Sequence, residues 1–197
     1  MKKYLLFFVF LLSASIVFAG LNIGVKVGYN AARLSTSMDT ITTNFKSGFQ
    51  FGAFVRIGKR FYVQPEVYYT TQGGVFTSNS SNWKQNIKLG SIDIPVLVGF
   101  KLINNDNLNL RILAGPAASI IVNKTIENTG NITDPITKTD INTLNWNIQA
   151  GAGVDLWKFT LDIRYQIGLN QLIKEVGAMK FDSHNNVWVV SLGFKIL

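Results

Sequence analysis

The stretch Phe159-Thr160-Leu161-Asp162-Ile163-Arg164-Tyr165-Gln166-Ile167-Gly168-Leu169 decides the fold. Its odd positions are all apolar or aromatic, and its even positions are all polar or Gly. Side chains of a strand point alternately to opposite faces, so this period of two predicts a strand with one apolar and one polar face. Its length of about ten residues is what a tilted strand needs to cross a bilayer.

The same alternation recurs along the chain. In residues 146–156, Trp146 and Ile148 share one face while Asn147 and Gln149 share the other. Segments that follow the rule with more exceptions are residues 21–30, 49–57, 61–72, 92–102, 108–117 and 188–197. Beyond the first nineteen residues, no apolar run approaches the roughly 18 residues typical of a spanning helix. The sequence therefore predicts eight membrane-crossing strands.

The connections between these segments alternate in length. Residues 58–60, 104–107 and 157–158 form short connections. The long connections are rich in Ser, Thr, Asn and Gly, and they cover residues 31–48, 73–88, 121–145 and 170–187. Exported barrels have short periplasmic turns at one rim and longer extracellular loops at the other. Nothing in a soluble β-sandwich favours this separation of short and long loops. The fold class we predict is all-β, an eight-stranded antiparallel up-and-down transmembrane β-barrel with both ends on the short-turn rim.

The distribution of charge indicates which face points inward. A soluble lipocalin-like barrel, the main competitor, would place apolar residues inside around a ligand. Here the mostly polar face carries ionised residues of both signs: Lys26, Arg56, Glu66, Asp93, Lys101, Arg111, Asp155, Asp162, Arg164 and Lys195. The opposite face is nearly free of charge, as lipid requires. We expect these groups to pair inside a filled lumen without a wide pore, with Glu66 close to Arg111 or Arg164, and glycines on the same face to make room for them.

Residues 1–19 have the features of a secretory signal peptide. Lys2 and Lys3 form a positive start, an apolar run follows, and Val17-Phe18-Ala19 places small residues where a signal peptidase cleaves. A membrane anchor is the alternative, but the apolar run is shorter than the roughly 20 residues a span needs. We therefore expect two parts, a signal peptide at 1–19 and a barrel domain at 20–197, in a protein of the bacterial outer membrane.

Composition excludes several classes of function. With one His and no Cys, the usual zinc, haem and thiol sites are not expected, so we predict no metal and no cofactor. Asp182-Ser183-His184 resembles a hydrolase motif, but adjacent residues of an extended chain point to opposite sides and cannot form a triad. The net charge of +8 is spread along the chain, so we expect contact with outer-membrane lipid and lipopolysaccharide and no nucleic-acid partner.

Five stretches resemble the PorT-like family of outer-membrane β-barrel proteins. They are FYVQPEVYY (61–69), IDIPVL (92–97), LAGP (113–116), AGAGV (150–154) and RYQIGL (164–169). The Gln-Pro-Glu and Asp-Ile-Pro elements are the most specific, although a Pro inside a strand pattern suggests a bulge or an edge. The resemblance implies a barrel in the outer membrane and, in a few members, service in secretion or gliding machinery.

The sequence supports a structural or surface-binding role. Residues 123–143 combine hydroxyl and amide side chains with a few apolar ones such as Ile126, and envelope proteins could bind through such long loops. We predict that the protein is not an enzyme. The alternatives are a component of a secretion or gliding assembly, a narrow channel, or an enzyme that modifies lipid A.

Overall fold

The computed structural model describes residues 20–34, 41–78, 84–105, 107–129, 141–170 and 185–197. The signal peptide predicted at 1–19 and the motif at 182–184 lie outside the described residues. The strands are β1 (Leu21–Leu34), β2 (Ile41–Lys46), β3 (Gly48–Gly58), β4 (Phe61–Ser78), β5 (Lys84–Asn104), β6 (Leu108–Thr129), β7 (Leu144–Leu156), β8 (Phe159–Gly168) and β9 (Asn185–Lys195). In these residues no helix is long and apolar enough to cross a membrane.

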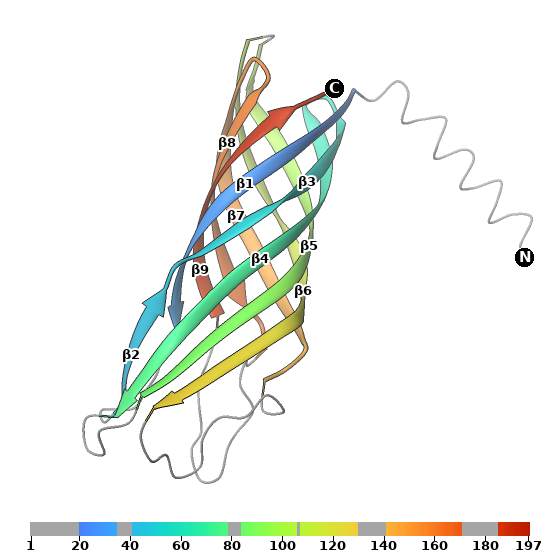
Figure 1. The fold of residues 1–197 in the computed structure, drawn as a ribbon. Coiled ribbons are helices and arrows are strands. Elements are labelled where there is room, and N and C mark those ends of the chain that lie inside the picture. The colour runs from blue at the N-terminus through green and yellow to red at the C-terminus, as the bar shows by residue number, and fades with distance from the viewer. Residues whose placement is uncertain (1–19, 35–40, 79–83, 106, 130–140, 171–184) are drawn as a thin grey trace, which may run out of the picture.

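The strands close into one antiparallel barrel. Around the ring the order is β3-β1-β9-β8-β7-β6-β5-β4, and pairing of β3 with β4 completes the circle. Strands β2 and β3 both pair with β4 and are separated only by Ser47, so they form one barrel strand in two parts. The prediction of an eight-stranded up-and-down barrel is confirmed. Both Gly20 and the C-terminal residue lie at the short-turn rim, at the top of Figure 1.

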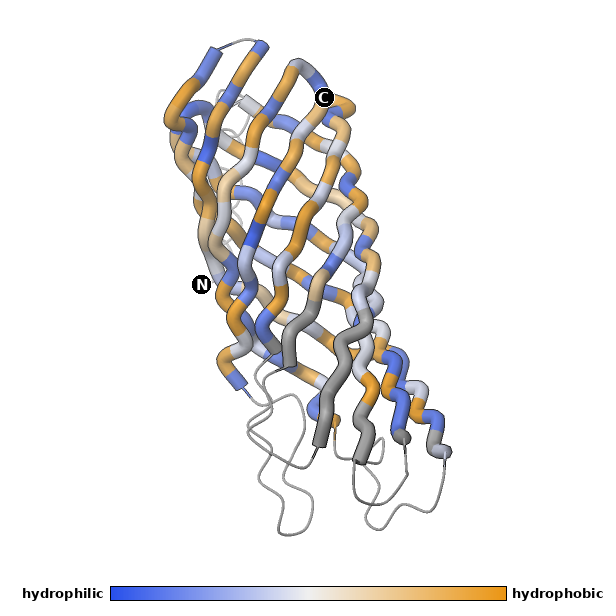
Figure 2. The backbone as a smooth tube through the Cα atoms, turned by 90° about the vertical axis from the view of Figure 1, so that its left-hand side faces the viewer, coloured by the Kyte–Doolittle hydropathy of each residue, from blue (hydrophilic) through white to orange (hydrophobic). Residues whose placement is uncertain are grey.

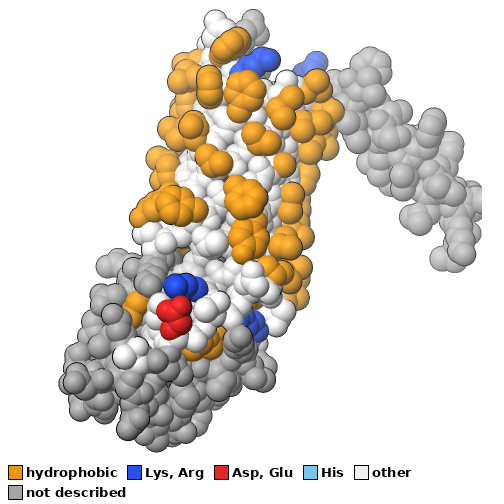
Figure 3. Space-filling view, in the orientation of Figure 1, with side chains coloured by type: hydrophobic (Ala, Val, Ile, Leu, Met, Phe, Trp, Pro, Cys, Tyr) orange, Lys and Arg blue, Asp and Glu red, His pale blue; other side chains and the backbone are white. Residues whose placement is uncertain are grey.

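The two faces of the wall differ in chemistry. Buried and exposed residues alternate along β8, where Leu161 and Ile163 face outward and Asp162 and Arg164 face inward. Figure 2 shows the same alternation of hydrophobic and hydrophilic residues along the other strands, and Figure 3 shows hydrophobic side chains covering the outer face of the barrel body. An apolar exterior around a charged interior is the arrangement of a barrel that stands in lipid.

Aromatic side chains pack in pairs near both ends of the apolar band. The Phe61 and Phe100 rings lie 4.6 Å apart at the short-turn rim. Towards the other rim, the Tyr165 and Trp188 rings lie 4.8 Å apart. Aromatic girdles of this kind mark the two membrane–water interfaces of outer-membrane barrels.

Several strands are longer than the sequence predicts. β1 continues to Leu34 and β2 occupies Ile41–Lys46, so much of the predicted connection at 31–48 is strand. β4 continues to Ser78, β5 begins at Lys84 and β6 continues to Thr129, so much of the predicted connections at 73–88 and 121–145 is strand. Together with β2, these strands reach past the ends of the others at the long-loop rim (Figure 1). The prediction of loops there was wrong because water replaces lipid on the outside, so the outward positions are polar and the alternation disappears.

Irregularities accompany this extension. In the β5–β6 pair, Gly90 faces Asn123 but Ser91 faces Ile121, which leaves Val122 as an extra residue. On the other side of β4, Lys46 pairs with Gly73 while Gln50 pairs with Thr70, so one extra residue lies in β2–β3 as well. A bulge exchanges the faces beyond it. On β6 the odd-numbered residues up to Ile121 face inward, whereas beyond the extra residue the odd-numbered Asn123 and Thr125 face outward.

The prolines of the two most specific sequence elements interrupt the ladders locally. Pairing of β3 with β4 is broken between Phe54–Glu66 and Ile57–Val63, where Pro65 lies. Pairing of β4 with β5 is broken between Pro65–Val96 and Tyr68–Asp93, where Pro95 lies. Because Pro has no N–H to donate, these gaps explain how the wall accommodates it inside a strand.

Candidate functional site

A chain of ion pairs crosses the middle of the lumen. Lys26 Nζ on β1 lies 2.7 Å from Glu66 Oε1 on β4 and 2.6 Å from Asp162 Oδ2 on β8. Arg164 Nη1 lies 2.6 Å from Glu66 Oε2, and Arg111 Nη2 on β6 contacts Asp162. All five side chains are buried. Of the two partners expected for Glu66, the structure gives it Arg164.

The chain continues towards the short-turn rim. Arg111 Nε lies 3.1 Å from Asp155 Oδ1, and Arg56 Nη1 lies 2.6 Å from Asp155 Oδ2. Lys195 Nζ is 4.0 Å from the same carboxylate and is less deeply buried. Lys101 is half-buried near this rim. Among the described residues its ammonium group makes no ion pair within 4.0 Å, so its part in the network stays a prediction.

Asp93, which we also expected in the network, lies elsewhere. Its Oδ1 accepts a hydrogen bond of 2.9 Å from Ser91, two residues away on the same strand. Asp93 pairs across the β4–β5 ladder with Tyr68, on the long-loop side of Glu66. The lumen therefore brings together eight of the ten predicted charges and leaves Asp93 and Lys101 apart.

Uncharged side chains complete the network, and the sequence analysis did not single them out. Gln64 accepts a hydrogen bond of 2.6 Å from Arg56 and donates one of 2.5 Å to Glu66. Gln149 accepts one of 3.1 Å from Arg164, and Thr160 accepts one from Arg111. Each occupies the same alternate positions as the charges on its strand, so the period of two could have identified them.

Glycines provide the space that the long side chains occupy. A Cβ on Gly153 would lie 2.1 Å from Asp162 Oδ1 and 2.8 Å from Arg111 Nη2, and a Cβ on Gly99 would lie 2.1 Å from the Tyr62 ring. The lumen also contains apolar side chains that we did not expect, among them Phe54, whose ring lies under Lys26 Nζ at 4.7 Å. Polar, aromatic and apolar side chains therefore pack together inside the barrel.

The balance of charge defines what this network can do. It holds four deeply buried cations, Lys26, Arg56, Arg111 and Arg164, against three carboxylates, Glu66, Asp155 and Asp162. Every carboxylate is shared by two cations, so its oxygens are occupied. Among the described residues no group of three or more His, Cys, Asp or Glu could hold a metal ion.

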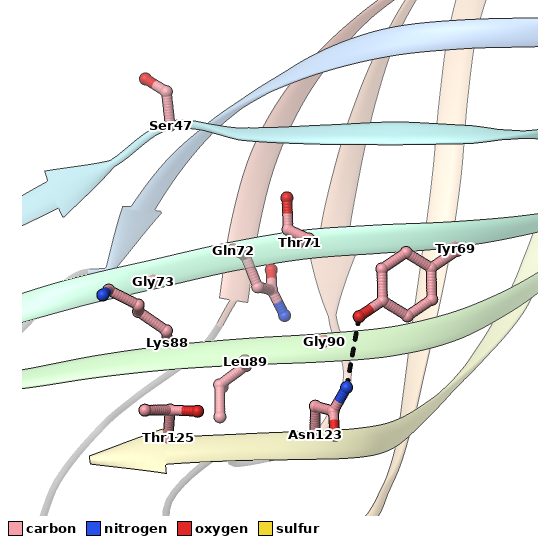
Figure 4. Close-up of a pocket in the computed structure, with 10 residues that line it drawn as sticks. All are labelled: Ser47, Tyr69, Thr71, Gln72, Gly73, Lys88, Leu89, Gly90, Asn123 and Thr125. Atoms are coloured by element: carbon pink, nitrogen blue, oxygen red, sulfur yellow. Dashed lines mark hydrogen bonds between the residues drawn. The ribbon is translucent and has the colours of Figure 1, made fainter.

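A second site lies on the outer wall, where β4, β5 and β6 leave the apolar band. Figure 4 shows this hollow of about 500 Å³ with Tyr69 and Thr71 from β4, Lys88 from β5, and Asn123 and Thr125 from β6. Further lining comes from Ser47, Gln72, Gly73, Leu89 and Gly90. The two glycines lie on neighbouring strands and leave the floor open. At Gly90 a Cβ would lie 2.6 Å from the Tyr69 hydroxyl, so only Gly lets that ring lie across β5.

The hollow mixes polar and apolar surface and carries little net charge. The Asn123 amide donates to the Tyr69 hydroxyl at 3.4 Å (Figure 4). At the edge of the hollow, Lys88 Nζ lies 3.2 Å from Glu127 Oε1, and both side chains are more than half exposed. Since an exposed pair of this kind is screened by water, it cancels charge and adds little stability.

Comparisons with known proteins agree with this architecture. Residues 13–174 match the family model described as an outer membrane protein beta-barrel domain. No curated protein matches the chain. The outer membrane protein OprG from Pseudomonas aeruginosa has a similar structure, with a TM-score of 0.56, 8% identity, and coverage of 90% of this chain and 96% of that chain. At this identity the similarity shows the fold alone.

Two further solved structures are similar at lower scores. Neisserial surface protein A has a TM-score of 0.48 and 10% identity, covering 90% of this chain and 99% of its own. Ail, the attachment invasion locus protein of Yersinia pestis, has a TM-score of 0.47 and 14% identity, covering 89% and 98%. The family model spans well over half of the sequence, and the closed antiparallel barrel matches its description. The chain therefore belongs to the outer membrane protein beta-barrel domain family and is a membrane protein of the bacterial outer membrane.

Proposed function

We propose that this protein is a sealed barrel that acts through its outer wall and its extracellular rim, in a structural or surface-binding role. The observation that carries the proposal is the chain of buried ion pairs from Arg56 to Arg164. An eight-stranded barrel is only wide enough for its own side chains. Arginines in the middle of such a lumen leave no continuous path for solutes, so the surfaces left for function are on the outside.

Single-channel recording in planar bilayers tests the sealed lumen. We expect the purified, refolded protein to show no porin-like conductance. A double variant, Arg111→Ala with Arg164→Ala, removes two of the largest fully buried side chains and should raise ion leakage if it still folds. A heat-modifiability gel checks folding. Large conductance in the wild-type protein would overturn the proposal, whatever the variant does.

The extended part of the wall supports a role at the cell surface. Beyond Gly90 and Val122 the outward positions of β5 and β6 are Asn86, Lys88, Asn123, Thr125 and Glu127, all polar. Rigid strands that hold polar groups above the membrane are suited to present a binding surface.

An affinity capture from crosslinked cells would compare the wild-type protein with a variant that lacks residues 130–140. This deletion spares the whole of β6, whereas removal of 123–143 would also destroy its pairing with β5. We expect an envelope partner to be captured by the wild-type protein and lost with the deletion. Capture of the same partners at the same level by both would argue against binding through this part of the rim.

Placement within the PorT-like family is part of this proposal. Gln64-Pro65-Glu66 and Asp93-Ile94-Pro95 support it, and they occupy neighbouring positions on β4 and β5. Service in a secretion or gliding assembly would follow from that resemblance alone. The proposal includes no catalytic step and no cofactor, and its expected lipid partners are the phospholipid and lipopolysaccharide around the barrel.

A further inference from the structure

The hollow on β4–β6 lies at the height where the outer face changes from apolar to polar. Immediately towards the membrane lie Ile92 and Val122, which expose 37% and 47% of their surface. On the side away from the membrane, the hollow is lined by Lys88 and Thr125 of the same two strands. A molecule seated in the hollow would therefore sit at headgroup level, with apolar wall beneath it and water above it.

The lining of the hollow offers hydrogen bonds with little net charge. Hydroxyl groups come from Ser47 and Thr125, and an amide comes from Asn123. The Thr71 hydroxyl donates to the Phe49 carbonyl and accepts from the Phe49 N–H, each at 3.1 Å. The Tyr69 ring adds one aromatic surface over Gly90. Amide, hydroxyl and aromatic groups around an open floor match a ligand with many hydroxyls and apolar C–H faces. A volume of about 500 Å³ is within the usual range for small-ligand sites.

The electrostatics of the hollow disfavour a phosphate as the main ligand. Among the described lining residues, Lys88 carries the positive charge, and Glu127 stands 3.2 Å from its ammonium group. Strong phosphate sites instead gather arginines or several backbone N–H groups around the anion. An uncharged sugar ring is the better match.

We propose that this hollow binds an uncharged sugar ring of an outer-leaflet glycolipid, lipopolysaccharide, whose phosphate groups would lie outside the hollow. The inference rests on the proposed function, in which the outer wall is the working surface. A glycolipid is favoured over a soluble saccharide because its acyl chains would lie against the exposed apolar wall directly below, at Ile92 and Val122. The bound lipid would connect the rigid barrel to the lipopolysaccharide layer.

The test blocks the hollow and leaves its surroundings intact. Thr125→Trp places a large side chain in the hollow. Thr129→Trp is the matched control, because Thr129 is exposed on the same face of β6, four residues further from the membrane, and does not line the hollow. Each protein is reconstituted in nanodiscs that contain phosphatidylethanolamine and purified rough lipopolysaccharide. Lipopolysaccharide retained after detergent extraction is then counted by native mass spectrometry.

We expect Thr125→Trp to lower retention about tenfold or more, with Thr129→Trp close to wild type. Asn123→Ala, which removes only the amide, should lower retention by a smaller factor. Equal retention in Thr125→Trp and wild type would overturn the proposal, as would equal loss in Thr125→Trp and Thr129→Trp.

Two competing probes identify the source of the ligand. The soluble core oligosaccharide released from the same lipopolysaccharide should compete weakly, since it lacks the acyl chains. Competition by the free oligosaccharide as strong as that by intact lipopolysaccharide would overturn the glycolipid assignment in favour of a soluble saccharide. Equal displacement by phosphatidylglycerol would show a general anion site and would also overturn it. Because the conductance test does not involve Thr125 or Asn123, failure here is distinguishable from failure of the sealed-barrel proposal.

Discussion

Asp162→Asn should destabilise the barrel far more than Lys26→Met, although the two side chains form one ion pair. Among the most deeply buried residues of the ion-pair network, four cations face three carboxylates. Asp162→Asn leaves four against two, because it removes the negative charge that Lys26 and Arg111 share and replaces one of the two acceptor oxygens by an NH2 group. Removing one partner of a buried pair costs about 3–5 kcal/mol because a charge is left uncompensated.

Lys26→Met has the opposite effect on the balance of charge. It leaves three cations against three carboxylates, with Glu66 still held by Arg164 and Asp162 still held by Arg111. Methionine also fills most of the volume of the lysine stem. We therefore expect a loss of about 1 kcal/mol, because each carboxylate keeps one cation and no buried charge is left uncompensated.

The assay is reversible unfolding in urea from phospholipid vesicles, followed by tryptophan fluorescence and by the shift on unboiled gels. The difference in free energy of unfolding between the two variants should be at least about 2 kcal/mol, with Asp162→Asn the less stable. If Lys26→Met is as destabilising as Asp162→Asn, the surplus of positive charge does not govern the lumen, and the reasoning fails.

Two further substitutions test the lumen and the membrane boundary in the same assay. Gly153→Ala should lower the free energy of unfolding by about 1–3 kcal/mol, because its Cβ would displace the contact between Arg111 and Asp162; an unchanged midpoint would show that the space is not needed. Ile163→Arg should cost about 2–4 kcal/mol because Ile163 is exposed in the middle of the apolar band, whereas Asn123→Arg on the extended wall should cost little, and equal costs would contradict the boundary placed at the hollow.

The faces of the strands could be predicted from the sequence because each strand has lipid on one side and packed polar groups on the other. Strand β8 follows this rule at every position from Phe159 to Gly168. The alternation of apolar and polar residues is lost where the outer face meets water in place of lipid. At Lys88 and Thr125 water replaces lipid outside, and the extra residue at Val122 reverses the order of the faces.

The lumen could be predicted in composition but not in its contacts. Alternation places Glu66, Arg111 and Arg164 inside, yet two cations of equal charge compete for one carboxylate. The choice of Arg164, 98 residues from Glu66, depends on the tilt of the strands and the stagger of the whole ring. The hollow on β4–β6 could not be predicted either, because its lining residues come from three strands and their outward direction depends on a bulge.

The ion pairs of the lumen also bear on the order in which the barrel forms. Neighbours along the chain pair as local hairpins, but β1 and β9 pair across the ends, with Gly24 opposite Lys195. Lys26–Asp162 and Arg164–Glu66 likewise join residues 136 and 98 positions apart. Local pairing is fast and distant pairing is slow. An open sheet would therefore hold charges without their partners, at a high cost in lipid, until β1 pairs with β9 and closes the barrel. We expect closure of the barrel and pairing of the lumen charges to be a single cooperative event, so that half-closed sheets are scarce during insertion.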